Sequence, residues 1–220
     1  MEAYLDSFEW IVAACLERQG FWTMTSVTVN LSKAEKRRIG LPTSPRWELD
    51  VVAYRAANNE LLVMECKSFL DSIGVRCATF EGKNSRDAKR YKLFLNPSIR
   101  RVVLRRLALD FVKDKRCRPK PKVTLGLAAG KLFGDERRLR ALFDRKGWRL
   151  IGPGELADDL AGLPQAGYQN DVASLVAKLL DQRATPSSRS RRAVASTRFT
   201  SRARKTQSGG FFGARPSSTP

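Results

Sequence analysis

The sequence predicts an α/β fold in which a central mixed β-sheet is flanked by helices. Three observations predict it: strand-like apolar runs alternate with segments of helical periodicity, turn-forming residues separate them, and 42% of the 220 residues are hydrophobic. This content suffices for one well-buried domain plus a tail. We therefore expect a single domain over residues 1–182 and a different kind of segment over residues 183–220.

A helix and a strand are expected first. The apolar residues of positions 1–18 recur at helical spacing, and the pattern stops at Gly20. Positions 21–30 alternate and are rich in Thr, Val and aromatic residues, which is typical of a strand. The basic stretch 33–38, which two prolines follow, predicts a loop.

A β-hairpin is the next expected element. Residues 47–54 (WELDVVAY) and 61–67 (LLVMECK) are two strand-like runs. The residues between them include Asn58 and Asn59, which suit turn conformations. The two runs are therefore expected to pair as antiparallel neighbours.

Helices and strands alternate after the hairpin. Helices are expected at 86–95 and 99–113, with Ser85 and Ser98 as N-caps and Asn96-Pro97 as the break between them. A strand at 123–128, a helix at 136–146 ended by Gly147, a strand at 148–151 and helical stretches at 155–160 and 171–181 follow. This alternation favours a sheet with helices on both faces.

The segment from Arg183 onward has a different composition. Ser, Thr, Pro, Gly and Arg dominate, no acidic residue occurs, and eight Arg and one Lys carry +9 of the net charge of +19. Such a composition predicts a disordered basic tail. Two interpretations stay open for the tail: a sequence-independent tether to nucleic acid, or a solvated extension.

The positive charge favours a polyanionic partner. With +10 remaining on residues 1–182, the expected domain is basic in its own right, and nucleic acid is the leading partner class. Acidic residues interrupt the apolar positions of the first twenty residues, and no apolar run reaches membrane-spanning length. We expect no membrane partner and a cytoplasmic location.

Several kinds of site are excluded by residue inventory. The chain has no His and no CxxC pair, so common zinc sites and Ser-His-Asp hydrolases are excluded, and the four Cys are expected to be buried thiols. Residues 126–131 (GLAAGK) fail the phosphate-binding-loop pattern, so no nucleotide cofactor is expected. We expect a strand-to-helix turn there, from which Lys131 contacts a DNA phosphate. Trp10, Trp22, Trp47 and Trp148 are interpreted as core anchors rather than base-stacking platforms.

Three charged residues interrupt the apolar hairpin strands. Asp50 lies in the first strand, and Glu65 and Lys67, two residues apart, share one face of the second. A buried carboxylate needs a cation or a hydrogen-bonding partner. We expect Asp50 and Glu65 to bind one Mg²⁺, for which Mn²⁺ can substitute, with the backbone carbonyl of Cys66 as a third ligand. Lys67 would orient an attacking water and stabilise charge at a scissile phosphate.

These residues resemble a known family. Asp50, followed after fourteen residues by Glu65-Cys66-Lys67, is similar to the motif of the PD-(D/E)xK nuclease superfamily, whose fold is restriction-endonuclease-like. The expected order of helices and strands agrees with that fold over about residues 3–151. Leu49 stands where the family name has proline, a position at which proline is frequently missing in the family.

The resemblance implies further site residues. In the family a glutamate of the first helix often joins the metal site, and Glu9 is the matching position; the alternative is a solvated helix glutamate. Basic residues of a later helix commonly reach the phosphate, which makes Lys89, Arg90 and Lys92 candidates for nucleic-acid binding. Double-strand cleavage in the family often uses two copies, so a homodimer is one expected assembly.

Two functions are therefore carried forward. The first is a Mg²⁺-dependent deoxyribonuclease, endo- or exonucleolytic, with Asp50, Glu65 and Lys67 as its catalytic residues and a role in DNA defence, repair or recombination. The second is a non-catalytic module that binds DNA or RNA on the same scaffold. Retention of all three charged residues favours the enzyme.

Overall fold

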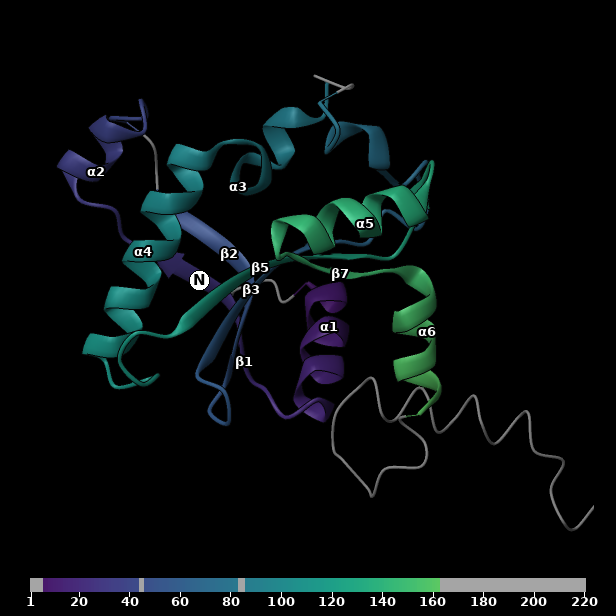
Figure 1. Ribbon diagram of the computed structural model, residues 1–220, viewed down its shortest axis with the longest axis horizontal. Helices are drawn as coiled ribbons and strands as arrows, with labels where there is room; N and C mark the ends of the chain where they lie inside the picture. Colours follow the sequence, from purple (N-terminus) through teal and green to yellow (C-terminus); the bar gives the residue numbers. More distant parts are fainter. Residues whose placement is uncertain (1–5, 44–45, 83–85, 163–220) are drawn as a thin grey trace, which may run out of the picture.

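A five-stranded mixed sheet in the order β1-β2-β3-β5-β7 lies at the centre of the molecule (Figure 1). The computed structural model describes residues 6–43, 46–82 and 86–162. Its strands are β1 (Trp22–Val29), β2 (Trp47–Arg55), β3 (Glu60–Lys67), β4 (Val75–Arg76), β5 (Lys122–Ala129), β6 (Leu132–Phe133) and β7 (Arg149–Ile151). Its helices are α1 (Ser7–Arg18), α2 (Lys33–Arg38), α3 (Lys92–Leu95), α4 (Pro97–Lys113), α5 (Glu136–Lys146), α6 (Pro153–Ala161) and the 3-10 turns η1 (Cys77–Thr79) and η2 (Ala88–Arg90).

The expected hairpin is confirmed. β1, β2 and β3 pair in antiparallel fashion, and the β2–β3 ladder closes at Arg55 and Glu60, whose side chains form an ion pair of 2.7 Å. Asn59 adopts a left-handed conformation with φ 51° in the turn, which asparagine tolerates better than most residues. The turn therefore fixes the register that places Asp50 opposite the end of β3.

The second half of the sheet is parallel. β3 pairs with β5, and β5 with β7, in parallel register, so helices must cross over between them. Leu61 to Met64 and Leu125 to Ala129 are buried without interruption, as strands covered on both faces require. The carboxyl ends of β3 and β5 consequently lie side by side.

Helices cover both faces of the sheet (Figure 1). On one face α1 and α6 pack through Phe8, Val12, Leu16 and Leu156. On the other, α3, α4 and α5 enclose a cluster of aromatic rings that includes Phe80, Tyr91, Phe94, Phe143 and Trp148. This arrangement confirms the α/β class with helices flanking a mixed sheet.

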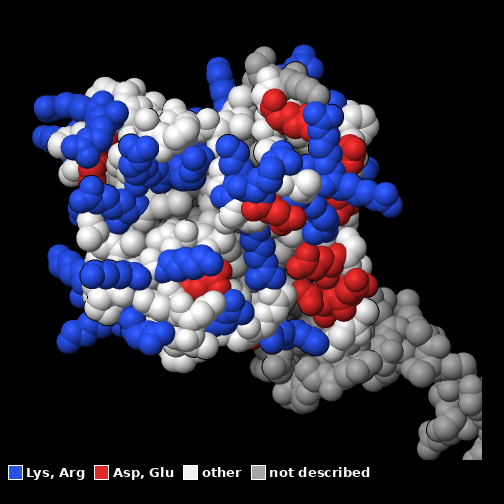
Figure 2. Space-filling model, viewed as in Figure 1, with Lys and Arg blue, Asp and Glu red and all other residues white. Residues whose placement is uncertain are grey.

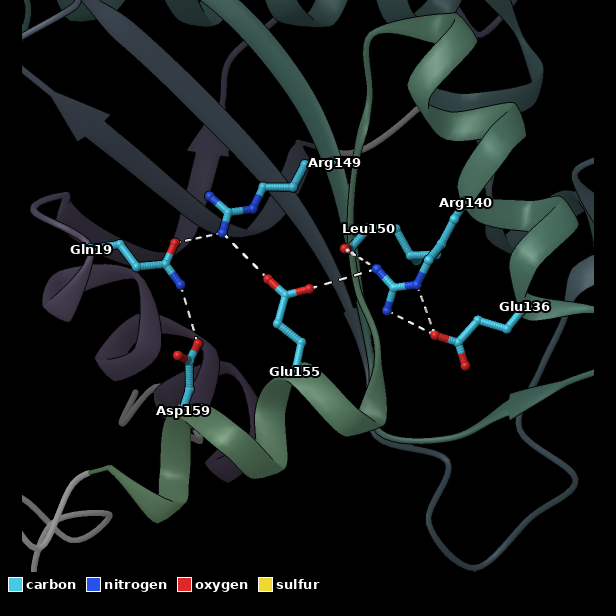
Figure 3. Close-up of polar contacts among 7 residues, drawn as sticks. All are labelled: Gln19, Glu136, Arg140, Arg149, Leu150, Glu155 and Asp159. Atoms are coloured by element: carbon cyan, nitrogen blue, oxygen red, sulfur yellow. Dashed lines mark hydrogen bonds and ion pairs between the residues drawn. The ribbon is translucent and has the colours of Figure 1, made fainter.

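A polar network joins α6 to the rest of the domain (Figure 3). Arg149 of β7 contacts Glu155 of α6 at 3.6 Å and donates to Gln19 at the end of α1, and Gln19 donates to Asp159 at 3.1 Å. Arg140 of α5 pairs with Glu136 at 2.8 Å and Glu155 at 3.7 Å, and donates to the carbonyl of Leu150 at 3.4 Å. The network therefore links three helices to the sheet edge at β7.

The prediction of a loop at 33–38 was wrong, because these residues form the helix α2. Ser32 and Glu35 make a reciprocal capping box: Glu35 N donates to Ser32 Oγ at 3.2 Å, and Ser32 N donates to the Glu35 carboxylate at 2.8 Å. A capping box supplies partners for the first free N–H groups of a helix. α2 buries no residue, so apolar periodicity could not reveal it.

The prediction of one helix over 86–95 was also wrong, because the helical parts of this segment are shorter and separate. It consists of the 3-10 turn η2 and the single-turn helix α3, separated at Tyr91 with φ −118° and ψ 42°. The N-cap of α4 is Asn96 rather than Ser98, because the Asn96 side chain accepts from Ser98 N and Ile99 N at 3.0 Å and Pro97 occupies the first helical position. Ser85 lies outside the described residues.

The segment 126–131 does not form the expected strand-to-helix turn. Gly126 to Ala129 belong to β5, and the chain passes through Gly130 and Lys131 into β6. A Cβ at Gly126 would lie 2.3 Å from the Met64 sulfur and 3.1 Å from the carbonyl oxygen of Arg149, so a side chain there would have to displace the buried Met64. The pattern of glycines therefore reflects the sheet and no phosphate-binding loop.

Two of the four tryptophans are not core anchors. Trp22 is 82% exposed and Trp10 is 40% exposed, because β1 is an edge strand and Trp10 faces away from the sheet. Trp47 and Trp148 pack against the core as expected. All four cysteines are free and buried, which confirms the expected thiols.

Some expectations fall outside the described part of the chain. They are residues 1–5, the helical stretch 171–181, the rest of the domain up to residue 182 and the basic tail 183–220. The helix expected at 155–160 is present as α6. Within the described ranges, no helix has the length and apolar character needed to cross a bilayer.

Candidate metal and nucleic-acid site

Asp50 lies where the β2–β3 ladder ends. Backbone pairing between the two strands begins at Val51 and Met64, and beyond it the N–H of Cys66 donates to Asp50 Oδ2 at 2.7 Å. The carboxylate thus takes the place of a strand carbonyl, which satisfies the N–H and orients the acid toward β3. Asp50 is fixed by this bond between the two strands.

The alternation of side chains between the two faces of β2 is interrupted at Asp50. Leu49 and Val52, three residues apart, belong to one core cluster, whereas Val51 belongs to the other. The neighbouring β1 residue Ser26 has φ 51°, a left-handed conformation that interrupts the pleat at the same level. The interruption leaves Asp50 outside both apolar clusters and free to meet the charged residues of β3.

The ammonium of Lys67 joins the three predicted oxygen donors. Its Nζ lies 2.8 Å from Glu65 Oε1, 2.9 Å from the carbonyl oxygen of Cys66 and 3.4 Å from Asp50 Oδ2. The charged side chains are each about one-fifth exposed. The structure therefore brings Asp50, Glu65, the Cys66 carbonyl and Lys67 together at the carboxyl end of β3, as the sequence predicts; their catalytic role stays a prediction.

Electrostatics at this centre keep the lysine charged. Burial alone would lower the pKa of Lys67, but the carboxylates of Glu65 and Asp50 raise that pKa above its ordinary value. Burial raises the pKa of Glu65, which the adjacent Lys67 opposes and Asp50 reinforces. The Lys67 ammonium is thus the positive charge that stabilises the neighbouring carboxylates of Glu65 and Asp50.

Glu9 of α1 belongs to the same electrostatic group. It is half-buried, and its pKa is raised to about 7 by burial and then by the negative charges of Asp50, Asp6 and Glu48. The helix thus places Glu9 near Asp50, as the family resemblance implies. Excess negative charge at this point favours binding of a further cation.

We expect Glu9→Gln to change the pH dependence of stability. Because the folded-state pKa of about 7 lies above the ordinary 4.5, the stability associated with Glu9 is complete below pH 4.5 and is lost as pH rises through 7. Solvent screens the half-buried group, so we expect the variant to gain about 1 kcal/mol over wild type at pH 8. Chemical denaturation in EDTA at pH 5 and pH 8 measures it. Equal free energies of unfolding for Glu9→Gln and wild type at pH 8 would contradict the raised pKa of Glu9. The measurement at pH 5 is the control, because the gain in stability of the variant should be smaller there.

Tyr91, which the sequence analysis did not single out, is a buried core residue whose pKa is influenced by the charges of the Asp50 centre. It is 2% exposed, and burial raises its pKa to about 12, while Lys67 opposes and Glu65 reinforces the shift. Within the described ranges its hydroxyl has no hydrogen-bond partner, which is rare for a buried hydroxyl. The available signal in the sequence was the position of Tyr91 between the basic residues Arg90 and Lys92. A continuous helix was expected over this segment, but the structure has η2 and α3 as separate elements.

The predicted phosphate contacts are placed unequally. The guanidinium of Arg90 lies 5.7 Å over the ring of Phe69, two residues after Lys67. Lys131 is exposed and follows Gly130, whose N–H donates to the Lys67 carbonyl at 3.0 Å. Lys89 and Lys92 are exposed, and the structure records no contact between either of them and the Asp50 centre in the described ranges. Arg90 and Lys131 are therefore the better-placed candidates.

The oxygen donors fit a hard divalent cation. Mg²⁺ takes carboxylate and carbonyl oxygens together with water, and the contacts of Lys67 Nζ demonstrate that Asp50, Glu65 and the Cys66 carbonyl converge on one positive charge. Over residues 6–43, 46–82 and 86–162, no group of three or more His, Cys, Asp or Glu side chains is arranged around a common metal position. The side chains at hand are two carboxylates, with Glu9 as a third nearby.

The chain is similar to two solved structures. No family model matches the chain, and no curated protein matches it. Two solved structures are similar: the protein of unknown function AF1548, at 19% identity and TM-score 0.35, and VC1899 from Vibrio cholerae, at 20% identity and TM-score 0.36. The matches cover 67% and 71% of this chain but only 58% and 32% of the respective structures.

Proposed function

We propose that the protein is a metal-dependent nuclease that hydrolyses DNA phosphodiester bonds, built on a restriction-endonuclease-like fold. The observation that carries the proposal is the convergence of Asp50, Glu65 and the Cys66 carbonyl on the Lys67 ammonium, within 3.4 Å at the end of a strand. Support for the fold comes from the order of a helix, three antiparallel strands, a crossover helix and a parallel strand.

The residues of the centre have distinct roles in this proposal. Asp50, Glu65 and the Cys66 carbonyl would hold Mg²⁺ or Mn²⁺, with Glu9 as an auxiliary ligand, and the bound ion would supply Lewis-acid polarisation of the phosphate. Lys67, whose pKa is raised by Glu65 and Asp50, carries its positive charge to the scissile phosphate and orients a water by hydrogen bonding. Asp50 keeps the end of β3 in place through the Cys66 N–H.

The surface charge supports a polyanionic substrate. Figure 2 shows Lys and Arg side chains gathered over α2 and α4, whereas acidic side chains gather near α6. Exposed cations on α2 and α4 are Lys33, Arg37, Arg38, Arg101, Arg105 and Lys113. Contacts of such residues with phosphates would make binding salt-dependent and independent of sequence.

The test compares wild type, Lys67→Ala and Lys122→Ala on supercoiled plasmid, a linear DNA strand and an RNA strand. Lys122 is an exposed lysine at the start of β5, paired with Glu60 at the far end of β3, and serves as the matched control. With Mg²⁺ or Mn²⁺, we expect wild type and Lys122→Ala to cut DNA and Lys67→Ala to be slower by roughly 10²–10³-fold. EDTA should abolish cleavage.

The same experiment separates the two functions carried forward. If wild type and Lys67→Ala bind DNA equally and neither cuts any substrate with either metal, the protein is a binding module. Cleavage of the RNA strand alone would keep the metal centre and change the substrate. Endonucleolytic products from the circular plasmid would distinguish an endonuclease from an exonuclease.

A further inference from the structure

A cavity of about 360 Å³ lies between the small β4–β6 sheet and the start of α5. Its wall includes Arg76, Cys77, Glu81, Phe133, Asp135 and Arg138. None of these residues takes part in the Asp50 centre. The volume is at the lower end of the roughly 300–1,000 Å³ of small-molecule sites, which suits a single ring system. We call this cavity the Phe133 pocket.

The Phe133 pocket is close to the proposed catalytic centre. Gly130 N donates to the carbonyl of Lys67 at 3.0 Å, and β6 begins two residues later. Val75 N donates to the carbonyl of Lys131 at 2.9 Å, which ties β4 to the same end of the sheet. Three residues of extended chain, from Gly130 to Phe133, span at most about 10 Å. A strand bound at Lys67 therefore needs only a few nucleotides to reach the pocket.

An exposed aromatic ring is the main feature of the pocket. Phe133 is 53% exposed, and the guanidinium of Arg76 lies 5.4 Å over its ring. An aromatic face and a guanidinium plane are the two surfaces on which proteins stack unpaired bases. The exposed ring of Phe133, with the Arg76 guanidinium beside it, therefore offers a stacking surface for a planar ligand.

The charges of the pocket disfavour a phosphate. Arg138 pairs with Glu81 at 2.5 Å, and Arg76 pairs with Asp87 at 3.5 Å. The Asp135 carboxylate accepts from Arg138 N at 3.0 Å as the N-cap of α5. The two arginines are thus matched by carboxylates, so the pocket offers no excess positive charge. A neutral heterocycle with donors and acceptors at its edge fits these surroundings better than an anion.

We propose that the Phe133 pocket holds one unpaired nucleobase of a strand bound at the Asp50 centre. The proposal rests on DNA being the polymer bound there, but it does not require that the DNA be cut. The base stacks on Phe133 beside Arg76, and the polar rim meets the base edge. The pocket thereby gives the protein a preference for a single-stranded or locally opened substrate.

The test measures binding in EDTA, where no cleavage occurs. Fluorescence anisotropy with a labelled single strand and with a duplex of the same sequence is compared for wild type, Phe133→Ala and Trp22→Ala. Trp22 is 82% exposed at the start of β1, opposite Tyr54 near the hairpin turn, and is the matched exposed aromatic control. We expect Phe133→Ala to weaken single-strand binding by about tenfold, with duplex binding and the Trp22→Ala variant little changed. Moving an abasic nucleotide along the strand should identify one position that weakens wild type and leaves Phe133→Ala unaffected.

The outcomes separate this proposal from the proposed function. Equal single-strand affinity of Phe133→Ala and Trp22→Ala, or an equal loss on single strand and duplex, would overturn the pocket while leaving the nuclease in place. A Phe133-dependent abasic position in a protein that never cuts would support the pocket and overturn the nuclease. Circular dichroism of Phe133→Ala verifies that the fold is retained.

Discussion

Replacement of Lys67 by methionine is expected to destabilise the metal-free protein and to tighten its binding of divalent cations. In the structure the ammonium is the counter-ion of Glu65, 2.8 Å away, and Asp50, 3.4 Å away, in an enclosed position. Methionine keeps the apolar stem but leaves two crowded carboxylates without a positive charge. Breaking a buried pair costs about 3–5 kcal/mol, and the partial exposure here reduces the expected loss to about 2–3 kcal/mol.

Thermal unfolding and calorimetry measure both effects. A loss of 2–3 kcal/mol corresponds to a fall in Tm of roughly 5–10 °C for a domain of this size. Addition of Mn²⁺ should restore most of that loss, because an ion that binds only the folded state stabilises it by mass action. Titration should give a Kd for Mn²⁺ at least about tenfold lower than that of wild type, since the competing ammonium is gone.

Lys122→Met is the matched control for this experiment, since Lys122 is exposed at the opposite end of β3 and β5. Its Tm in EDTA and its affinity for Mn²⁺ should equal those of wild type. An unchanged affinity in Lys67→Met would mean that the carboxylates do not form the metal site. Loss of cleavage combined with gain of metal affinity would separate the chemical role of Lys67 from any role in holding the ion.

Gly130→Ala is expected to disturb the centre from a distance. A Cβ at this position would lie 2.5 Å from the carbonyl oxygen of Ser68, 3.1 Å from Leu70 Cδ2 and 3.2 Å from Phe8 Cε2. The backbone carbonyl cannot move without shifting the end of β3, whose Lys67 carbonyl accepts from Gly130 N at 3.0 Å. We expect a loss of about 1–3 kcal/mol from overpacking. Displacement of Lys67 by an ångström would slow cleavage by roughly 10²-fold.

Gly154→Ala provides the control, because a Cβ there meets nothing within 4 Å and the backbone conformation suits any residue. Its stability and activity should match or exceed those of wild type. Denaturant unfolding and single-turnover cleavage measure the two quantities. Wild-type cleavage by Gly130→Ala would show that the position of β3 at Lys67 does not depend on the β5 terminus.

The fold was predictable where local patterns match the tertiary environment. The hairpin carries apolar strands and turn-forming asparagines, and α5 carries an apolar stripe, a capping Asp135 and a terminal Gly147. α2 was not predictable from apolar periodicity, because it is stabilised by its capping box and buries nothing. The exposure of Trp22 was not predictable either, since alternation identifies a strand but does not reveal that it lies at the sheet edge.

The candidate site was also predictable where the local sequence pattern reflects the folded environment. Charges within apolar strands identified Asp50, Glu65 and Lys67, because burial makes an unpaired charge costly. The direct contacts of Lys67 with all three oxygen donors depend on how β2 and β3 part beyond Val51, which spacing alone does not specify. The position of Tyr91 was not predicted, because a continuous helix was expected where the chain is interrupted at this residue between η2 and α3.

The contact of Arg140 with Leu150 has a consequence for assembly. In the part of the chain that the structure describes, β7 is the last strand of the sheet, and an unpaired strand edge can pair with a second chain. Here the guanidinium of Arg140 donates to the Leu150 carbonyl and forms ion pairs with Glu136 and Glu155 (Figure 3). A second copy that extended the sheet at β7 would compete with Arg140 for the Leu150 carbonyl. If two copies act on one duplex, we therefore expect them to meet through side-chain surfaces, so that each sheet, and each candidate metal site, lies within its own chain.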